Sequence, residues 1–205
     1  MTVNKKGILV VVSGPAGVGK GTVCDVVSKN NPEIFISISA TTRAPRRGEV
    51  DGVHYYFKTK EQFEEMIENN ELLEYNKFVN GNYYGTPAKE CDTRLENGVN
   101  IILEIDVEGG KQVRAKRPDA VMIFVLPPSF CELEKRLRGR SSETEEDILS
   151  RLARSEAEFE YGKKYDYLIV NDMPEMAAAK IQAIIEAEKH RTFRCLNEVK
   201  KNIIR

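Results

Sequence analysis

Four short runs of mainly apolar residues organise the chain, at residues 8–12, 99–105, 121–126 and 166–171. These runs lack the regular alternation with polar residues that a half-exposed strand would show. Continuous apolar runs of this length are typical of strands buried on both faces, as in a parallel sheet packed between helices. Helical patterns fall between the runs. We therefore predict an α/β fold whose mostly parallel sheet is flanked by helices.

Local signals predict several helix boundaries. A helix over 21–30 follows the first apolar run, and Thr86-Pro87 predicts an N-cap followed by proline at the first helical position. Gly98 is expected to end that helix. The last helix is predicted to begin near Asp172 and to continue past 189 toward residue 200. Two further helix starts carry the spacing of a capping box, namely Ser129 to Glu132 and Thr144 to Asp147.

Two segments interrupt the alternation of strands and helices. Residues 37–86 are polar and rich in turns, with one short helical pattern from Thr59 to about Asn69. Residues 138–160 are rich in charged side chains, which predicts a mobile lid made of a loop and a helix. We therefore predict an inserted lobe at 37–86 and a lid at 138–160. The core would comprise the remaining segments, 1–36, 87–137 and 161–205.

Composition and charge narrow the classes of function. The chain has 205 residues, 31 basic and 32 acidic, and a formal net charge of −1. This balance argues against nonspecific nucleic-acid binding, so an anion site must be a local basic cluster. The apolar runs are too short to span a bilayer, so no membrane partner is expected. Neither zinc nor disulfide spacing links the cysteines, which favours thiols in a reducing cytoplasm; they are Cys24, Cys91, Cys131 and Cys195.

The first apolar run leads into a glycine-rich segment, SGPAGVGKGT, with the phosphate-loop (P-loop) spacing G-x-x-x-x-G-K. Its glycines allow positive φ and leave backbone N–H groups open to an anion. The following helix adds the partial positive charge of its N-terminus, and the lysine can reach the β- and γ-phosphates of a nucleotide. The residues expected to bind ATP here are Gly14, Pro15, Ala16, Gly17, Val18, Gly19, Lys20, Gly21 and Thr22.

The P-loop departs from the usual pattern at one position. A serine or threonine normally follows the lysine and binds magnesium. Here Gly21 follows the lysine, and Thr22 stands one place later. We therefore expect no direct metal ligand from the protein. Mg²⁺, the expected cofactor, would accompany ATP and be held through the nucleotide phosphates and water.

A second anion site is predicted in the inserted lobe. The segment SATTRAPRRGEVDGVHYYF carries Arg43, Arg46 and Arg47, with Tyr55 and Tyr56 close behind. Arginine forks bind phosphate oxygens in pairs, and tyrosine hydroxyls add neutral donors. The lobe ends in a further tyrosine-rich turn, GNYYGT. This pattern indicates a site for a phosphomonoester.

Two carboxylates follow the second apolar run. Glu104 and Asp106 are two residues apart on the predicted strand, so their side chains share one face. Ligands of open parallel sheets bind at the carboxyl ends of the strands. Both carboxylates are therefore expected near the P-loop.

Together these motifs resemble the guanylate kinase family of nucleoside monophosphate kinases. The chain contains, in the family's order, GPAGVGKGT, SATTRAPRRGEVDGVHYYF, GNYYGT, LEIDVEGG, KRLRGR followed by RL, and VND, which cover nearly its whole length. The resemblance implies a P-loop kinase core, a GMP-binding lobe at 37–86 and a lid at 138–160. It also implies transfer of the γ-phosphoryl group of ATP to GMP or dGMP.

By this resemblance, one group of side chains would hold the GMP phosphate and another would bind the guanine. The first group is Arg43, Arg46, Tyr55 and Tyr84, and the second is Ser39, Glu74, Thr86 and Asp106, with Glu104 beside them. Guanine presents N1–H and a 2-amino group, which a carboxylate accepts, whereas adenine would leave Glu74 unpaired. The family usually has serine at Thr86 and aspartate at Glu104. The hydroxyl is therefore kept, and the carboxylate is longer.

The lid would bring positive charge to the transferred phosphoryl group. The catalytic residues implied by the resemblance are Lys20, Arg43, Arg136, Arg140 and Arg151. Positioning and electrostatics, rather than a general base, would carry the rate. Asn171, in the VND motif, matches the position near adenine. Arg138 and Arg154 fall outside the matched pattern and are expected to be surface or helix-pair charges.

Two other functions stay open at this point. A guanylate-kinase-like module that binds phosphopeptides without catalysis would share the fold, although the intact Lys20 and glycines favour an enzyme. A kinase of another small phosphate ester fits less well with the full set of guanine-binding residues. The expected partners are the small-molecule substrates ATP and GMP or dGMP. The sequence leaves open whether the chain forms a homo-oligomer.

Overall fold

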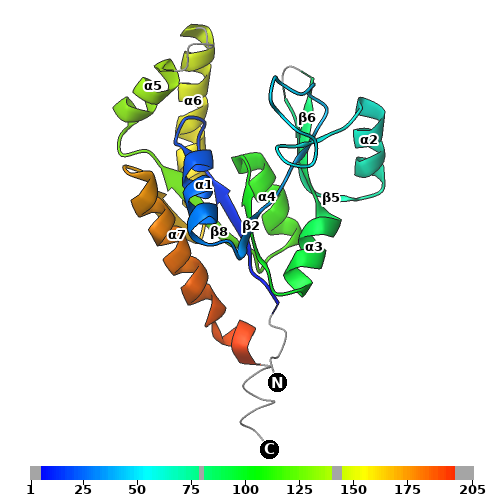
Figure 1. The fold of residues 1–205 in the computed structure, drawn as a ribbon. Coiled ribbons are helices and arrows are strands. Elements are labelled where there is room, and N and C mark those ends of the chain that lie inside the picture. Colours follow the sequence, from blue (N-terminus) through cyan, green and yellow to red (C-terminus); the bar gives the residue numbers. More distant parts are fainter. Residues whose placement is uncertain (1–5, 79–80, 140–144, 197–205) are drawn as a thin grey trace, which may run out of the picture.

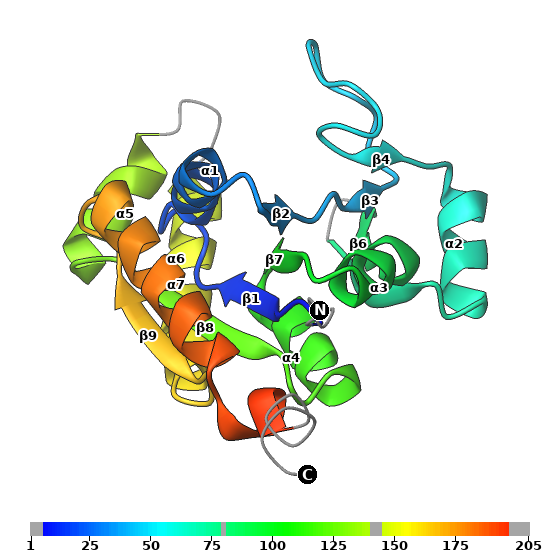
Figure 2. The same ribbon diagram turned by 60° about the horizontal axis from the view of Figure 1, so that its bottom comes forward.

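The computed structural model describes residues 6–78, 81–139 and 145–196. Its central sheet has five parallel strands in the order β2-β7-β1-β8-β9 (Figure 2). The strands are β1 (Leu9–Ser13), β2 (Ile34–Ile36), β7 (Asn100–Glu104), β8 (Val121–Leu126) and β9 (Tyr167–Val170). All but β2 lie where the apolar runs predict them. The α/β prediction with a parallel sheet is confirmed.

Helices cover both faces of this sheet, because successive side chains of a strand point to opposite sides. In β1, Val10 and Val12 join one buried cluster, and Leu9 and Val11 join the other. The helices on the first face are α1 (Lys20–Asn30), α5 (Phe130–Arg138) and α7 (Pro174–Lys189). Those on the second are α3 (Ala88–Glu96) and α4 (Val107–Lys116). In the described ranges, no helix is both long and apolar enough to cross a membrane.

A second, smaller sheet stands beside the first (Figure 2). Its order is β4-β3-β6-β5, with β6 antiparallel to both of its neighbours. The strands are β3 (Ala40–Thr41), β4 (Tyr56–Phe57), β5 (Leu72–Lys77) and β6 (Tyr83–Pro87), and α2 (Lys60–Glu68) packs on them. Glu74 of β5 pairs with Thr86 of β6. Glu74 of this sheet and Glu104, at the carboxyl end of β7, line the same cavity.

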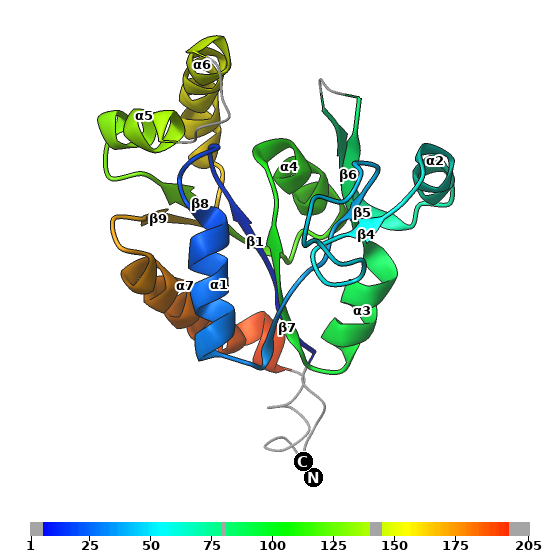
Figure 3. The same ribbon diagram turned by 45° about the horizontal axis from the view of Figure 1, so that its top comes forward.

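Helices α5 and α6 (Glu145–Gly162) and the second sheet rise at the same end of the molecule (Figures 1 and 3). They stand on opposite sides of the central sheet, and α4 lies between them in Figure 3. Ser129 begins α5 as predicted, since its hydroxyl accepts a hydrogen bond from the Glu132 N–H at 3.1 Å. Thr144, the other predicted cap, lies outside the described residues.

Two predicted helix boundaries are wrong. Thr86 belongs to β6 and Pro87 is the N-cap residue of α3, because the Thr86 hydroxyl is bonded to Glu74 instead of capping the helix. Helix α7 begins at Pro174, within two residues of the predicted start, but it ends at Lys189 instead of continuing toward residue 200, and helical residues resume only at 192–196. Residues 197–205 lie outside the described part of the chain. The predicted stop at Gly98 is confirmed by its φ of +83° after the C-cap.

Helix α4 is not evident from the sequence, because Gly109 and Gly110 lie side by side in its interior. Each glycine costs about 1 kcal/mol relative to alanine in a helix. The structure explains their presence: a Cβ on Gly109 would stand 2.6 Å from Glu74 Oε2. A Cβ on Gly110 would stand 2.3 Å from the Tyr165 hydroxyl. The two glycines therefore let α4 approach both neighbours closely.

Candidate active site

The P-loop joins the end of β1 to the start of α1. Gly14, Gly17 and Gly19 have φ values of +145°, +87° and +88°, which only glycine adopts readily. Gly19 is the N-cap residue of α1, and no side chain caps the helix there. The first N–H groups of α1 are thus left for an anion. The loop has the geometry of a phosphate cradle.

Lys20 lies over this loop. Its Nζ donates to Gly14 O at 2.6 Å and to Pro15 O at 3.1 Å. Burial lowers the pKa of Lys20, and the nearby Glu104 carboxylate opposes this shift. A phosphate bound in the loop would offer the ammonium group stronger, charged acceptors. The lysine is placed to exchange its carbonyl partners for phosphate oxygens.

The side chains of Asn171 and Arg136 are hydrogen-bonded to the P-loop. Asn171 is buried, and its Nδ2 donates to Val18 O at 2.7 Å. Arg136 Nη1 donates to both Val18 O and Asn171 O at 3.3 Å. A Cβ on Gly19 would stand 2.7 Å from Asn171 Nδ2, so the loop passes very close to the amide. In this structure both side chains support the loop.

The two departures from the usual pattern, Gly21 and Glu104, meet in space. A Cβ on Gly21 would lie 3.3 Å from Glu104 Oε1. The missing side chain at 21 thus leaves room for the longer carboxylate at 104. Carboxylate oxygens and water are the ligands that Mg²⁺ prefers, so the residues here fit a magnesium ion that arrives with ATP. In the described ranges, no group of three His, Cys, Asp or Glu residues forms a ready-made metal site.

A cavity of about 250 Å³ lies between β5, β6 and the end of β7, and we call it the acceptor pocket. It is lined by six residues predicted to bind GMP: Ser39, Tyr55, Glu74, Tyr84, Glu104 and Asp106. Asn76 and Phe78 also line it, although the sequence did not single them out. They follow Glu74 by two and four residues, and this alternation along β5 and the residue after it places all three on one face. That alternation is the signal that could have found them.

The inner end of the acceptor pocket is a buried carboxylate. Glu74 is only 4% exposed, and its Oε1 accepts a hydrogen bond from the Thr86 hydroxyl at 2.7 Å. Burial raises the pKa of Glu74 to about 7, Asp106 adds to the rise, and the Thr86 bond opposes it. An ionised Glu74 would gain from hydrogen-bond donors on a ligand. The pocket therefore suits a ring that presents neighbouring N–H groups.

The outer end of the acceptor pocket carries arginine and tyrosine. Arg43 Nη2 donates to Glu49 Oε1 at 2.8 Å, and its guanidinium carbon lies 5.4 Å from the centre of the Tyr55 ring. The Arg43 bond, together with the Arg46 N–H, lowers the pKa of Glu49 to about 2. Arg46 itself is exposed and contributes its backbone N–H to Glu49 at 2.7 Å. The Glu49 carboxylate thus takes the position beside Arg43 that a ligand phosphate would fill. The sequence did not reveal this role of Glu49.

The lid arginines are placed unevenly. Arg140 lies outside the described residues, and Arg151 lies half-buried on α6. Arg138 pairs with Glu134 and Glu145, which fits the predicted helix-pair charge. Arg154 pairs with Glu158 at 2.7 Å in the same helix. It also reaches Asp106 Oδ2 at 3.6 Å, so α6 contacts the acceptor pocket through a residue that was expected to be a surface charge.

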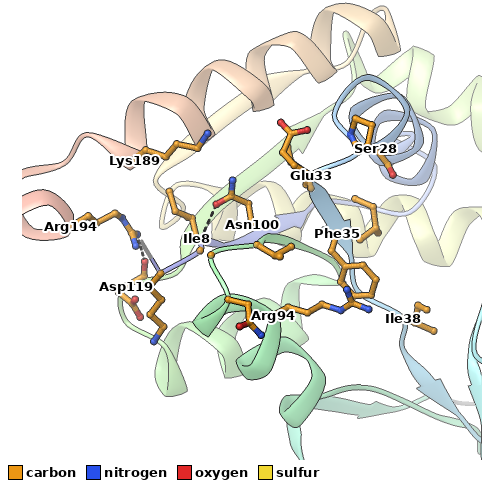
Figure 4. A pocket seen from close by; sticks show the side chains of 18 of the residues that line it. Ile8, Ser28, Glu33, Phe35, Ile38, Arg94, Asn100, Asp119, Lys189 and Arg194 are labelled. Atoms are coloured by element: carbon orange, nitrogen blue, oxygen red, sulfur yellow. Dashed lines mark hydrogen bonds between the residues drawn. The ribbon is translucent and has the colours of Figure 1, made fainter. Parts of the chain in front are cut away.

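A larger cavity, of about 960 Å³, lies at the other end of the central sheet (Figure 4). It is bordered by β2, the start of β7 and the segment after α7, and Arg94, Lys189 and Arg194 are among its lining residues. None of the predicted site residues lines it. Parallel sheets bind ligands at the carboxyl ends of their strands, where the P-loop and the acceptor pocket lie. We therefore assign the candidate active site to that end.

Comparisons with known proteins identify the family. A family model described as guanylate kinase matches residues 6–188. The chain is 54% identical over 184 residues to a guanylate kinase of Halalkalibacterium halodurans, covering 90% of each chain. It is 48% identical over 201 residues to one of Clostridium perfringens strain SM101, covering 98% of this chain and 91% of the relative. The crystal structure of guanylate kinase from Anaplasma phagocytophilum matches with a TM-score of 0.78 and 32% identity, over 97% and 96% of the two chains. This chain belongs to the guanylate kinase family.

Proposed function

We propose that the protein transfers the γ-phosphoryl group of ATP to GMP or dGMP, giving ADP and GDP or dGDP. The observation that carries this proposal is the buried Glu74 carboxylate at the inner end of a pocket near a P-loop. Relatives that are nearly full-length matches carry the name guanylate kinase, which supports the same reaction. We assign residues 37–86 to a GMP-binding lobe and residues 138–160 to a lid on the core.

The donor nucleotide would bind at the P-loop. Its β- and γ-phosphates would accept hydrogen bonds from backbone N–H groups of the loop, Pro15 excepted, and from the ammonium group of Lys20. Magnesium would accompany ATP and offset the charge of its phosphates, with Glu104 close enough to Gly21 to hold its bound water. Asn171, under the loop, would lie near the adenine end. The bond between Asn171 and Val18 supports a second role in keeping the loop in shape.

The acceptor base would bind at the inner end of the acceptor pocket. Guanine N1–H and its 2-amino group would donate to Glu74, with Thr86 and Asp106 beside it. Adenine has an acceptor at N1 and lacks the 2-amino group, so AMP would leave the carboxylate without a partner. An unpaired buried charge costs more than about 1–3 kcal/mol. This difference supports a strong preference for GMP.

The acceptor phosphate would bind at the outer end of the pocket. Arg43 would release Glu49 and bind the GMP phosphate, with Arg46, Tyr55 and Tyr84 completing the site. One oxygen of that phosphate attacks the γ-phosphorus of ATP. A new P–O bond forms as the bond from the β,γ-bridging oxygen breaks, and ADP leaves with that electron pair. The attacking oxygen is already anionic, so the step needs positive charge and positioning rather than a base.

The lid would supply the remaining charge. Arg136, Arg140 and Arg151 would close over the transferred group together with Lys20 and Arg43, which lowers the energy of its spread negative charge. Closure would also exclude water, which could otherwise accept the phosphoryl group. The scattered cysteines and the balanced net charge of −1 support activity in a reducing cytoplasm, with ATP and GMP or dGMP as small-molecule partners.

A coupled assay of ADP production from MgATP tests the proposal directly. GMP, dGMP, AMP, CMP and UMP are offered one at a time to the folded protein. We expect turnover with GMP and dGMP and little with the others. Turnover with another monophosphate alone would keep the kinase but reject the guanine assignment. A folded protein inactive with all five would support the phosphopeptide-binding alternative.

A further inference from the structure

Strand β5, which carries Glu74, lies at the end of the second sheet, where no strand of the described residues lies beside its outward backbone groups. Such edges leave N–H and C=O groups unpaired unless something covers them. Here helix α4 of the core supplies the partners through side chains. Gln112 Oε1 accepts from the Tyr75 N–H at 3.1 Å, and Gln112 Nε2 donates to Tyr75 O at 2.8 Å. One amide side chain thus bonds both edge groups of Tyr75, as a residue of a neighbouring strand would.

The same face of α4 makes further contacts with β5. Gln112 Nε2 also donates a longer hydrogen bond to Asn76 Oδ1, at 3.4 Å. Lys116 Nζ donates to Leu72 O at 2.9 Å. At the start of the helix, Asp106 Oδ1 accepts both from the Gly109 N–H that it caps and from Asn76 Nδ2, each at 2.8 Å. Gly109 itself gives the close approach to Glu74. The contact residues 106, 109, 112 and 116 are spaced three or four apart, which puts them on one side of the helix.

Glu74 is therefore held from two directions. Its strand pairs with β6, where Thr86 bonds its carboxylate, and its other side abuts α4. The backbone of Tyr75, the next residue, is bonded to α4 through the side chain of Gln112. A small slip of β5 along the helix would move the carboxylate away from the base. Displacements of about 1 Å are enough to weaken a site of this kind strongly.

We propose that Gln112 is a positioning residue that determines guanine recognition by tying β5 to α4. It contacts no substrate; it acts through the backbone of Tyr75 on the placement of Glu74. This inference rests on the proposed function, because it takes Glu74 as the group that binds guanine. It assigns part of base selectivity to the core helix, outside the GMP-binding lobe.

The test compares Gln112→Met with the unchanged enzyme. Methionine keeps the length and helix propensity of glutamine but can make neither bond to Tyr75. We expect the KM for GMP to rise by about 5- to 10-fold, the effect of losing roughly one net hydrogen bond at the site. The KM for ATP should stay within about 2-fold on the same reasoning. The preference for GMP over IMP, whose base lacks the 2-amino group, should fall as well.

Two further variants act as controls. Lys111→Gln changes the neighbouring residue on α4, which pairs with Glu108 rather than with β5, and should leave both KM values unchanged. Gln112→Glu keeps an acceptor for the Tyr75 N–H but places a carboxylate against Tyr75 O. It should therefore also raise the KM for GMP. This second variant decides the question if Gln112→Met does not fold.

The outcomes separate this inference from the function on which it rests. If Glu74→Gln weakens GMP use while both Gln112 variants keep the normal KM and GMP-to-IMP preference, the positioning role is wrong and the proposed function stands. If Glu74→Gln has no effect, the guanine assignment itself is wrong. An equal rise of both KM values in the Gln112 variants would indicate general loss of packing and would also overturn the positioning role.

Discussion

The proposed donor and acceptor sides of the active site are built in different ways. The P-loop is one continuous stretch that offers backbone N–H groups and a single lysine. The acceptor pocket collects side chains from β5, β6, the end of β7 and the segment around Tyr55. A local backbone motif tolerates change in its surroundings, whereas a pocket assembled from distant segments depends on how those segments pack. Variants on the two sides should therefore fail differently.

The largest effect is expected on the donor side. Lys20→Ala removes the ammonium group that would stabilise the negative charge of the transferred phosphoryl group. We therefore expect kcat to fall by about 100- to 1,000-fold. Circular dichroism should show an unchanged fold, because the Lys20 side chain bonds only to carbonyls of its own loop among the hydrogen bonds described. Near-normal turnover in this variant would remove Lys20 from the phosphate site.

The next effect is expected at the inner end of the acceptor pocket. Glu74→Gln keeps the shape but loses the charged acceptor, so kcat/KM for GMP should fall by about 10- to 100-fold. The KM for ATP should hardly change, since the donor site is separate. Steady-state kinetics with each substrate varied in turn measures this split. Unaltered GMP kinetics would exclude Glu74 from base recognition.

A pH dependence should mark the same carboxylate. Its folded pKa of about 7 lies above the unfolded value, so the folded protein binds more protons between about pH 4.5 and 7. Stability from this group is therefore present at low pH and is lost as the pH rises through 7. GMP affinity should run the opposite way and increase as Glu74 ionises.

Denaturant unfolding of the ligand-free protein and of Glu74→Gln at pH 5 and pH 8 measures the first of these trends. The glutamine variant should gain stability relative to the unchanged protein as the pH rises, by up to about 3 kcal/mol. A difference that stays constant with pH would mean that Glu74 titrates at an ordinary value.

The smallest effect concerns the contact between Gly21 and Glu104. Gly21→Ser brings a side chain against the Glu104 carboxylate and should lower kcat by about 3- to 5-fold through a coupling near 1 kcal/mol. Adding Glu104→Asp, which shortens the carboxylate, should recover most of the loss. A double-mutant cycle measures the coupling. Strictly additive effects would show that the two positions act independently.

The contrast between the two sides also explains what the sequence could predict. Four strands of the central sheet, the P-loop and its glycines follow from local patterns, since each depends on residues close together in the chain. The resemblance named most residues of the acceptor pocket. Helix α4 was not predicted, because Gly109 and Gly110 weaken the helical pattern of its sequence. These positions need glycine because the helix passes close to Glu74 and Tyr165 there.

Other contributions were hidden because they join segments far apart. Arg154, for example, reaches Asp106 from α6, a pairing that the spacing along the chain does not predict. Gln112 belongs to the same class, because its partner Tyr75 is 37 residues away. Thr86 was assigned to the guanine site by the resemblance and was also predicted to cap a helix. The tertiary bond to Glu74 takes its hydroxyl instead.

The most direct test of the difference between the two sides is GMP binding without turnover. Calorimetric titration of GMP, in the absence of ATP, would compare the unchanged protein with Lys20→Ala and Glu74→Gln at pH 8. We predict that Lys20→Ala binds GMP as the unchanged protein does, while Glu74→Gln binds it at least about 10-fold more weakly. Equal weakening in both variants, or none in Glu74→Gln, would contradict the assignment of the base to a separate acceptor pocket.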